Sequence, residues 1–96
     1  MTELLKALFS LGQVVSTPGA LSALGKEGIE AASLLERHAS ADWGELSEDD
    51  RRENELSLTE GFRILCAYTL PRTREKIWVI TEADRSVTTL LLPEEY

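Results

Sequence analysis

Residues 62–92 read FRILCAYTLPRTREKIWVITEADRSVTTLLL, and this stretch decides the fold. Three of its segments are rich in aromatic and β-branched residues, which is typical of β-strands: about 62–70, 76–82 and 87–92. The loop that begins at Pro71 and the turn at Asp84-Arg85 are short enough to join antiparallel neighbours. The stretch therefore predicts a three-stranded antiparallel meander.

The residues before this stretch carry helical signals instead. Apolar spacing and capping signals predict four helices, at about 3–10, 18–24, 27–39 and 48–60. Thr17 is placed to cap the second helix, with Pro18 at its first position, and Ser47 is placed to cap the fourth. Val14-Val15 lies between the first two helices as a brief extended piece. Helices grouped before strands predict an α+β fold in which the helical layer covers one face of the sheet.

Length and composition indicate one folded, soluble domain that spans residues 1–96. The chain has 96 residues, of which 43% are hydrophobic and 28% charged, a balance typical of globular proteins. Its single cysteine, Cys66, cannot form an internal disulfide, which fits a reducing compartment. We find no basic start of a signal peptide and no apolar run long enough to span a membrane, so we expect a cytoplasmic location.

The net charge of -7 is concentrated in the middle of the chain. Residues 26–60 contain eleven acids and four bases, whereas the segments on either side are balanced. A surface of this sign disfavours direct binding to nucleic acid, because phosphates need basic counterparts. It favours a basic protein surface as the partner, since complementary fields steer association.

The densest part of this charge lies between residues 42 and 60. Only Arg51 and Arg52 oppose eight acids there, which are the candidate partner-binding residues: Asp42, Glu45, Glu48, Asp49, Asp50, Glu53, Glu55 and Glu60. One interpretation is a solvated face that keeps a small domain soluble. The other is a row of carboxylates that imitates a row of phosphates, because residues three or four apart on a helix lie about 5–6 Å apart. The sequence leaves both open.

Few residues point to catalysis. His38 is the only histidine, so a catalytic dyad would have to pair it with Cys66, and nothing near that cysteine in sequence marks it as activated. The acids follow no EF-hand spacing, and the glycines form neither a GxGxxG nor a Walker motif. The sequence therefore predicts a protein that is not an enzyme, with no cofactor and no metal site.

Three motifs extend over nearly the whole chain: TPGA at 17–20, RHASADWG at 37–44 and IWVITEADRSVTTLLLPEEY at 77–96. The last two resemble the patterns RHxxGDWG and WxITEADRSxTTxLLPxEY of small proteins encoded by bacterial plasmids, phages and other mobile elements. Ala41 stands where the first pattern has glycine.

This resemblance implies a function that fits the charge. Some small acidic proteins with this resemblance are anti-CRISPR proteins. The resemblance therefore implies a small inhibitor in the host bacterial cytoplasm that blocks a basic DNA-binding surface of a type I CRISPR effector by DNA mimicry. The resemblance supplies no catalytic residues, and a monomer is the favoured oligomeric state. The alternative is an accessory module of a toxin–antitoxin or restriction-associated system that binds through an apolar surface.

Overall fold

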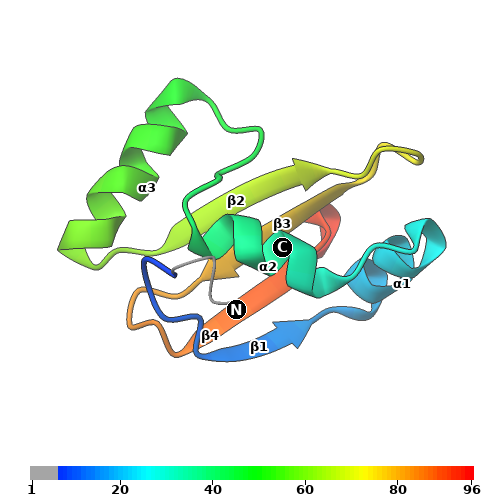
Figure 1. Ribbon diagram of the computed structural model, residues 1–96, viewed down its shortest axis with the longest axis horizontal. Helices are drawn as coiled ribbons and strands as arrows, with labels where there is room; N and C mark the ends of the chain where they lie inside the picture. The colour runs from blue at the N-terminus through cyan, green and yellow to red at the C-terminus, as the bar shows by residue number, and fades with distance from the viewer. Residues whose placement is uncertain (1–6) are drawn as a thin grey trace, which may run out of the picture.

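The computed structural model describes residues 7–96, which form three α-helices, a four-stranded sheet and a short 3₁₀ turn (Figure 1). The strands are β1 (Gln13–Ser16), β2 (Ile64–Thr69), β3 (Lys76–Thr81) and β4 (Val87–Leu91). The helices are α1 (Pro18–Glu27), α2 (Ala31–Ala39) and α3 (Glu48–Glu60), and the 3₁₀ turn is η1 (Pro93–Glu95). The strands lie in the order β1-β4-β3-β2.

The predicted three-stranded antiparallel meander is wrong, because the sheet has a fourth strand and is mixed. β2 pairs with β3 and β3 with β4 in antiparallel fashion, but β1 pairs in parallel with β4, with Gln13 opposite Val87. β1 has only four residues, too few to show a clear alternation of apolar and polar residues. Its partner strand also lies far along the chain, so no hairpin signal links the two.

The predicted helix at 18–24 and the start of the predicted helix at 27–39 also need correction. α1 continues to Glu27 and ends at Gly28, whose φ of 68° is left-handed. α2 begins only at Ala31 because of this break. Thr17 caps α1 by accepting a hydrogen bond from the Ala20 N–H at 3.1 Å.

The two remaining predicted helices are those at 48–60 and at 3–10. α3 has the predicted bounds of 48–60, because Ser47 caps it and Gly61 ends it with a φ of 80°. Residues 3–6 of the predicted helix at 3–10 lie outside the described residues, and residues 7–10 are not helical. Leu8 instead donates its N–H to the Ala39 carbonyl at 2.9 Å, at the end of α2.

The core lies between one face of the sheet and the helices α1 and α2. That face contributes the buried residues Ile64, Cys66, Tyr68, Ile77, Val79 and Leu90, and the helices contribute Ala20, Ala23, Leu24 and Leu34. Trp43, in the loop after α2, is also buried there. The expected helical layer is therefore made by α1 and α2 alone. α3 lies apart from them, next to β2 at the border of the sheet (Figure 1).

Candidate functional site

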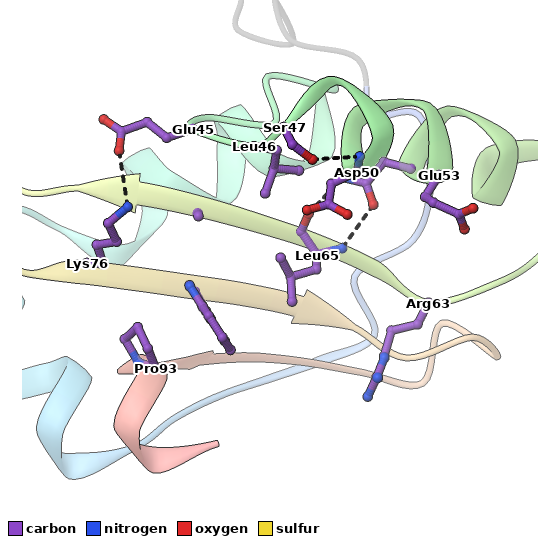
Figure 2. Close-up of a pocket in the computed structure, with 12 residues that line it drawn as sticks. Glu45, Leu46, Ser47, Asp50, Glu53, Arg63, Leu65, Lys76 and Pro93 are labelled. Atoms are coloured by element: carbon purple, nitrogen blue, oxygen red, sulfur yellow. Dashed lines mark hydrogen bonds and ion pairs between the residues drawn. The ribbon is translucent and has the colours of Figure 1, made fainter.

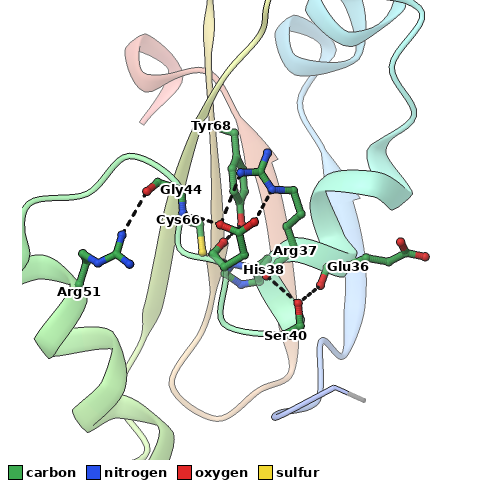
Figure 3. Close-up of polar contacts among 9 residues, drawn as sticks. Glu36, Arg37, His38, Ser40, Gly44, Arg51, Cys66 and Tyr68 are labelled. Atoms are coloured by element: carbon green, nitrogen blue, oxygen red, sulfur yellow. Dashed lines mark hydrogen bonds and ion pairs between the residues drawn. The ribbon is translucent and has the colours of Figure 1, made fainter. Parts of the chain in front are cut away.

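The motif RHASADWG at 37–44 holds the core together. Arg37 lies over the ring of Tyr68, 4.4 Å from its centroid, and donates to the Asp42 carboxylate at 2.7 Å (Figure 3). The Tyr68 hydroxyl in turn donates to the Asp42 backbone carbonyl at 2.5 Å. Gly44 forms a bridge beside Ala67 of β2. The contacts of this motif thus link α2 to the sheet.

His38 and Cys66, the two residues considered as a dyad, do meet in the structure. Nδ1 of His38 lies 2.7 Å from the Cys66 Sγ, and Nε2 lies 2.9 Å from the Thr81 hydroxyl (Figure 3 shows the first pair). The chain of contacts continues from Thr81 to Thr88 at 2.7 Å, and Thr88 donates to the Leu11 carbonyl at 2.7 Å. The Leu11 carbonyl can only accept a hydrogen bond, so one assignment of donors satisfies every group in this series of contacts. Each donor and each acceptor of the series is then used once.

The hydrogen-bond network around His38 is neutral and closed to solvent. Thr88 donates to Leu11, so Thr81 donates to Thr88 and the His38 Nε2–H donates to Thr81. Nδ1 of His38 is then unprotonated and accepts the thiol proton of Cys66. Burial raises the pKa of Cys66 to about 12 and lowers that of His38 to about 4, so both are neutral at pH 7. His38 and Cys66 both have 0% exposure, so the pair offers neither a thiolate nor access for a substrate.

The buried imidazole predicts a specific pH dependence of stability. The ordinary pKa of 6.5 applies in the unfolded chain, and burial lowers the folded value to about 4, so the unfolded chain alone takes up a proton in between. Stability therefore falls as the pH drops through this window, by about 2–3 kcal/mol between about pH 7 and about pH 4.5. Urea unfolding of the native chain and of His38→Gln at both pH values measures this loss. Protonation of the carboxylates lowers the stability of both proteins equally. Equal losses of unfolding free energy in the native chain and in His38→Gln would therefore contradict the prediction.

The eight candidate acids all lie in the loop at 42–47 and on α3, and all are exposed. Four of them make side-chain contacts within the described residues. Asp42 binds Arg37, Glu45 binds Thr69 and Lys76, Asp49 binds Arg52, and Glu55 accepts from the Trp43 indole. The hydrogen bond from Arg37 lowers the pKa of Asp42, and the one from Thr69 lowers that of Glu45.

The other four acids make no side-chain hydrogen bond or ion pair within residues 7–96: Glu48, Asp50, Glu53 and Glu60. The predicted set thus divides into acids that stabilise the loop and helix, and acids with free carboxylates. The sequence could not reveal this division, because partners such as Thr69 and Lys76 lie in two strands farther along the chain, β2 and β3.

α3 is attached to the sheet mainly by polar side chains, and the half-buried Leu58 adds an apolar contact with the core. Its buried residues are Asn54 and Ser57. The Asn54 amide donates to the Leu65 carbonyl at 2.7 Å and accepts from the Leu65 N–H at 3.2 Å. Ser57 donates to the Arg63 carbonyl at 3.1 Å. These contacts use backbone groups on the free side of β2, so α3 takes the place of a neighbouring strand.

Arg85 binds the C-terminal part of α3. Its guanidinium donates to the backbone carbonyls of Ser57 at 2.9 Å and Phe62 at 2.7 Å. A cation is favourable at this position because the carbonyls at the C-terminus of a helix carry partial negative charge. The sequence predicted Asp84 and Arg85 only as turn residues. It missed Asn54, Ser57 and Arg85 as anchors, although an asparagine in a helix interior is a signal, since it is disfavoured there without a specific contact.

A groove of about 570 Å³ separates α3 from the face of the sheet that α1 and α2 leave uncovered (Figure 2). Asp50 and Glu53 from α3 line one side of it, and Leu65 and Trp78 from β2 and β3 line the other. Trp78 also packs against the ring of Tyr96, with 5.7 Å between centroids. Lys76 and Arg63 lie among the lining residues as well. The groove therefore combines free carboxylates with an aromatic and aliphatic surface.

Other kinds of site find no support in the described part of the chain. Residues 7–96 bring together no group of three or more His, Cys, Asp or Glu side chains that could hold a metal ion. None of their helices is long and apolar enough to cross a membrane. Comparison of the chain with protein-family models, curated proteins and solved structures finds no match.

Proposed function

We propose that the protein is a non-enzymatic inhibitor that binds a basic, DNA-binding surface of its partner through the acidic face, which we define as the loop at 42–47 together with α3. The motif resemblance makes a type I CRISPR effector the partner that we expect. The mechanism is competition, in which carboxylates occupy Lys and Arg side chains that otherwise contact phosphates.

The exposure of α3 is the observation that carries this proposal. A helix that contributes to a core buries an apolar stripe, but the fully buried residues of α3 are Asn54 and Ser57, and its apolar contact with the core is the half-buried Leu58. Polar anchors hold the helix in place and leave the free carboxylates in solvent. Such a helix presents carboxylates to a partner without removing apolar contacts from the core. A phosphate mimic requires this property.

The groove beside α3 gives the proposal more chemical detail. An arginine side chain from the partner could place its guanidinium near Asp50 and Glu53 and its aliphatic stem against Leu65. The Trp78 ring offers an aromatic surface for such a cation. Lys76 and Arg63 at the groove would oppose an additional cation, so the contribution of Asp50 and Glu53 is essential to this binding mode.

The test compares two variants with the same change in net charge. The first neutralises the four free acids with Glu48→Gln, Asp50→Asn, Glu53→Gln and Glu60→Gln. The control neutralises four exposed acids outside the acidic face, with Glu30→Gln, Glu36→Gln, Glu82→Gln and Glu94→Gln. The readout is target-DNA binding by a purified type I effector in the presence of each protein.

We expect the native chain to inhibit DNA binding and the first variant to need about 100-fold more protein for the same effect, which corresponds to four charge contacts of modest size. The control should stay within about threefold, and high salt should weaken inhibition by the native chain. Equal losses in both variants would show that net charge alone matters. A complex that persists at high salt would favour the accessory module that binds through an apolar surface.

A further inference from the structure

The C-terminal motif PEEY at 93–96 places a second aromatic ring beside the groove. Tyr96 packs edge-on against Trp78, with 5.7 Å between the ring centroids and 66° between the ring planes. The Tyr96 side chain is 67% exposed, so most of its surface is open to a partner. Tryptophan and tyrosine are enriched among the residues that contribute most to binding between proteins. The two rings are therefore candidates for contact with a partner.

Glu95 holds the Tyr96 ring in this position. Its carboxylate accepts hydrogen bonds from the Thr17 hydroxyl at 2.5 Å and from the Gly19 N–H at 3.2 Å, at the start of α1. The hydrogen bond from Thr17 is the main cause that lowers the pKa of Glu95. A Cβ atom on Gly19 would collide with this carboxylate. The motifs TPGA and PEEY thus meet, and their contact fixes the end of the chain next to Trp78.

Arg63 shows that the Tyr96 ring accepts a guanidinium. Its Cζ lies over this ring, 5.9 Å from the centroid, at a distance where a cation is attracted to the electron-rich face. Figure 2 shows that the Arg63 side chain points away from α3. It forms no side-chain hydrogen bond or ion pair with any of residues 7–96. A contact of this exposed kind is weak, so a competing cation can replace it.

We propose that Arg63 occupies the guanidinium site of the groove in the free protein, and that an arginine of the partner replaces it beside Trp78 and Tyr96 in the complex. This inference rests on the proposed function and adds an internal competitor to the same site. An incoming arginine has the advantage, because the free carboxylates of Asp50 and Glu53 line the same groove. Arg63 pairs with neither of them.

The two rings favour arginine over lysine as the incoming side chain. A guanidinium is planar, stacks on aromatic faces and is more weakly hydrated than an ammonium. A lysine would gain the attraction of the carboxylates but would lose more of its hydration in approaching the rings. The site therefore discriminates between two side chains of the same charge.

The test titrates the protein with the peptide acetyl-Gly-Arg-Gly-amide and with its lysine counterpart. The NMR signal of the Trp78 indole N–H reports binding, and that of the buried Trp43 serves as the reference. The native chain should bind the arginine peptide more tightly than the lysine peptide. Arg63→Gln should bind the arginine peptide about fivefold more tightly than the native chain, since the competing cation is gone.

Two matched controls separate the site from net charge and from loss of the fold. Arg72→Gln makes the same change in net charge at an exposed residue that does not line the groove, so its affinity should stay within about 1.5-fold of the native value. Tyr96→Ala should weaken binding at least about threefold, whereas Tyr96→Phe keeps the ring and the affinity. Thermal unfolding of each variant checks that the fold is intact.

Equal affinities of the native chain and Arg63→Gln, or an equal gain in Arg72→Gln, overturn Arg63 as the competitor. Peptide binding that is absent, or that survives Tyr96→Ala unchanged, overturns the aromatic pair as the site, and equal binding of both peptides overturns the preference for arginine. None of these outcomes involves the effector. Peptide binding with the expected gain, in a protein that does not inhibit the effector, would overturn the proposed function alone.

Discussion

Replacing Gly44 with alanine is expected to destabilise the fold by at least about 3 kcal/mol. Gly44 has a φ of 77°, and a Cβ atom there would collide with the Ala67 carbonyl oxygen and lie 2.8 Å from the Tyr68 ring. That carbonyl accepts the hydrogen bond from the Glu45 N–H at 2.7 Å, so β2 and the loop cannot separate without losing it. Urea unfolding measures the loss, which should lower the melting temperature by at least about 12 °C in a domain of this size.

Gly61→Ala is the matched control for this prediction. Gly61 has nearly the same φ, 80°, but no atom lies within 4 Å of the position that its Cβ would take. This variant should lose only the left-handed penalty of about 1–2 kcal/mol. The difference between the two variants isolates the close approach of the loop to β2. If both lose the same free energy, the contact between Gly44 and Ala67 is not tight.

The second large effect is expected for His38→Ala, at about 3–5 kcal/mol. The substitution leaves a cavity and removes the shared partner of Cys66 and Thr81. It also removes a ring that packs edge-on against Phe9 at 5.2 Å and Trp43 at 6.4 Å. Equilibrium unfolding in urea at neutral pH measures the change.

Cys66→Ser serves as the comparison for His38→Ala. A serine keeps a donor at the same position toward Nδ1 of His38 and is close in volume, so we expect a loss of less than about 1.5 kcal/mol. The folded fraction of both variants should inhibit the effector as the native chain does, because both residues are buried. A His38→Ala variant that folds normally but no longer inhibits would contradict the purely structural role of the network.

Local signals explain which parts of the fold were predictable. α3 matches its predicted bounds because Ser47 and Gly61 act within one turn of the helix that they delimit. The sequence predicts β1 only as a brief extended piece, because its pairing with β4 depends on the tertiary structure. The same reason applies to the division between α1 and α2, since a sequence does not show that Gly28 rather than Gly25 takes the left-handed conformation.

The candidate site was predictable as a region but not in its details. The density of acids located the loop at 42–47 and α3, and those side chains are exposed. Their division into anchored and free carboxylates depends on contacts with β2 and β3, as Glu45 illustrates through Thr69 and Lys76. The groove beside Trp78 likewise requires knowledge of which sheet face the helices leave open.

The polar attachment of α3 has a consequence for the cooperativity of unfolding. Because the helix buries so little apolar surface, its detachment from β2 changes the heat capacity and the denaturant response far less than global unfolding does. We therefore expect the hydrogen bonds of Asn54 and Arg85 to contribute much of the free energy of such a local opening, in which α1, α2 and the sheet would remain folded. A partner that reoriented this charged helix would therefore disturb few contacts of the core, chiefly those of Leu58.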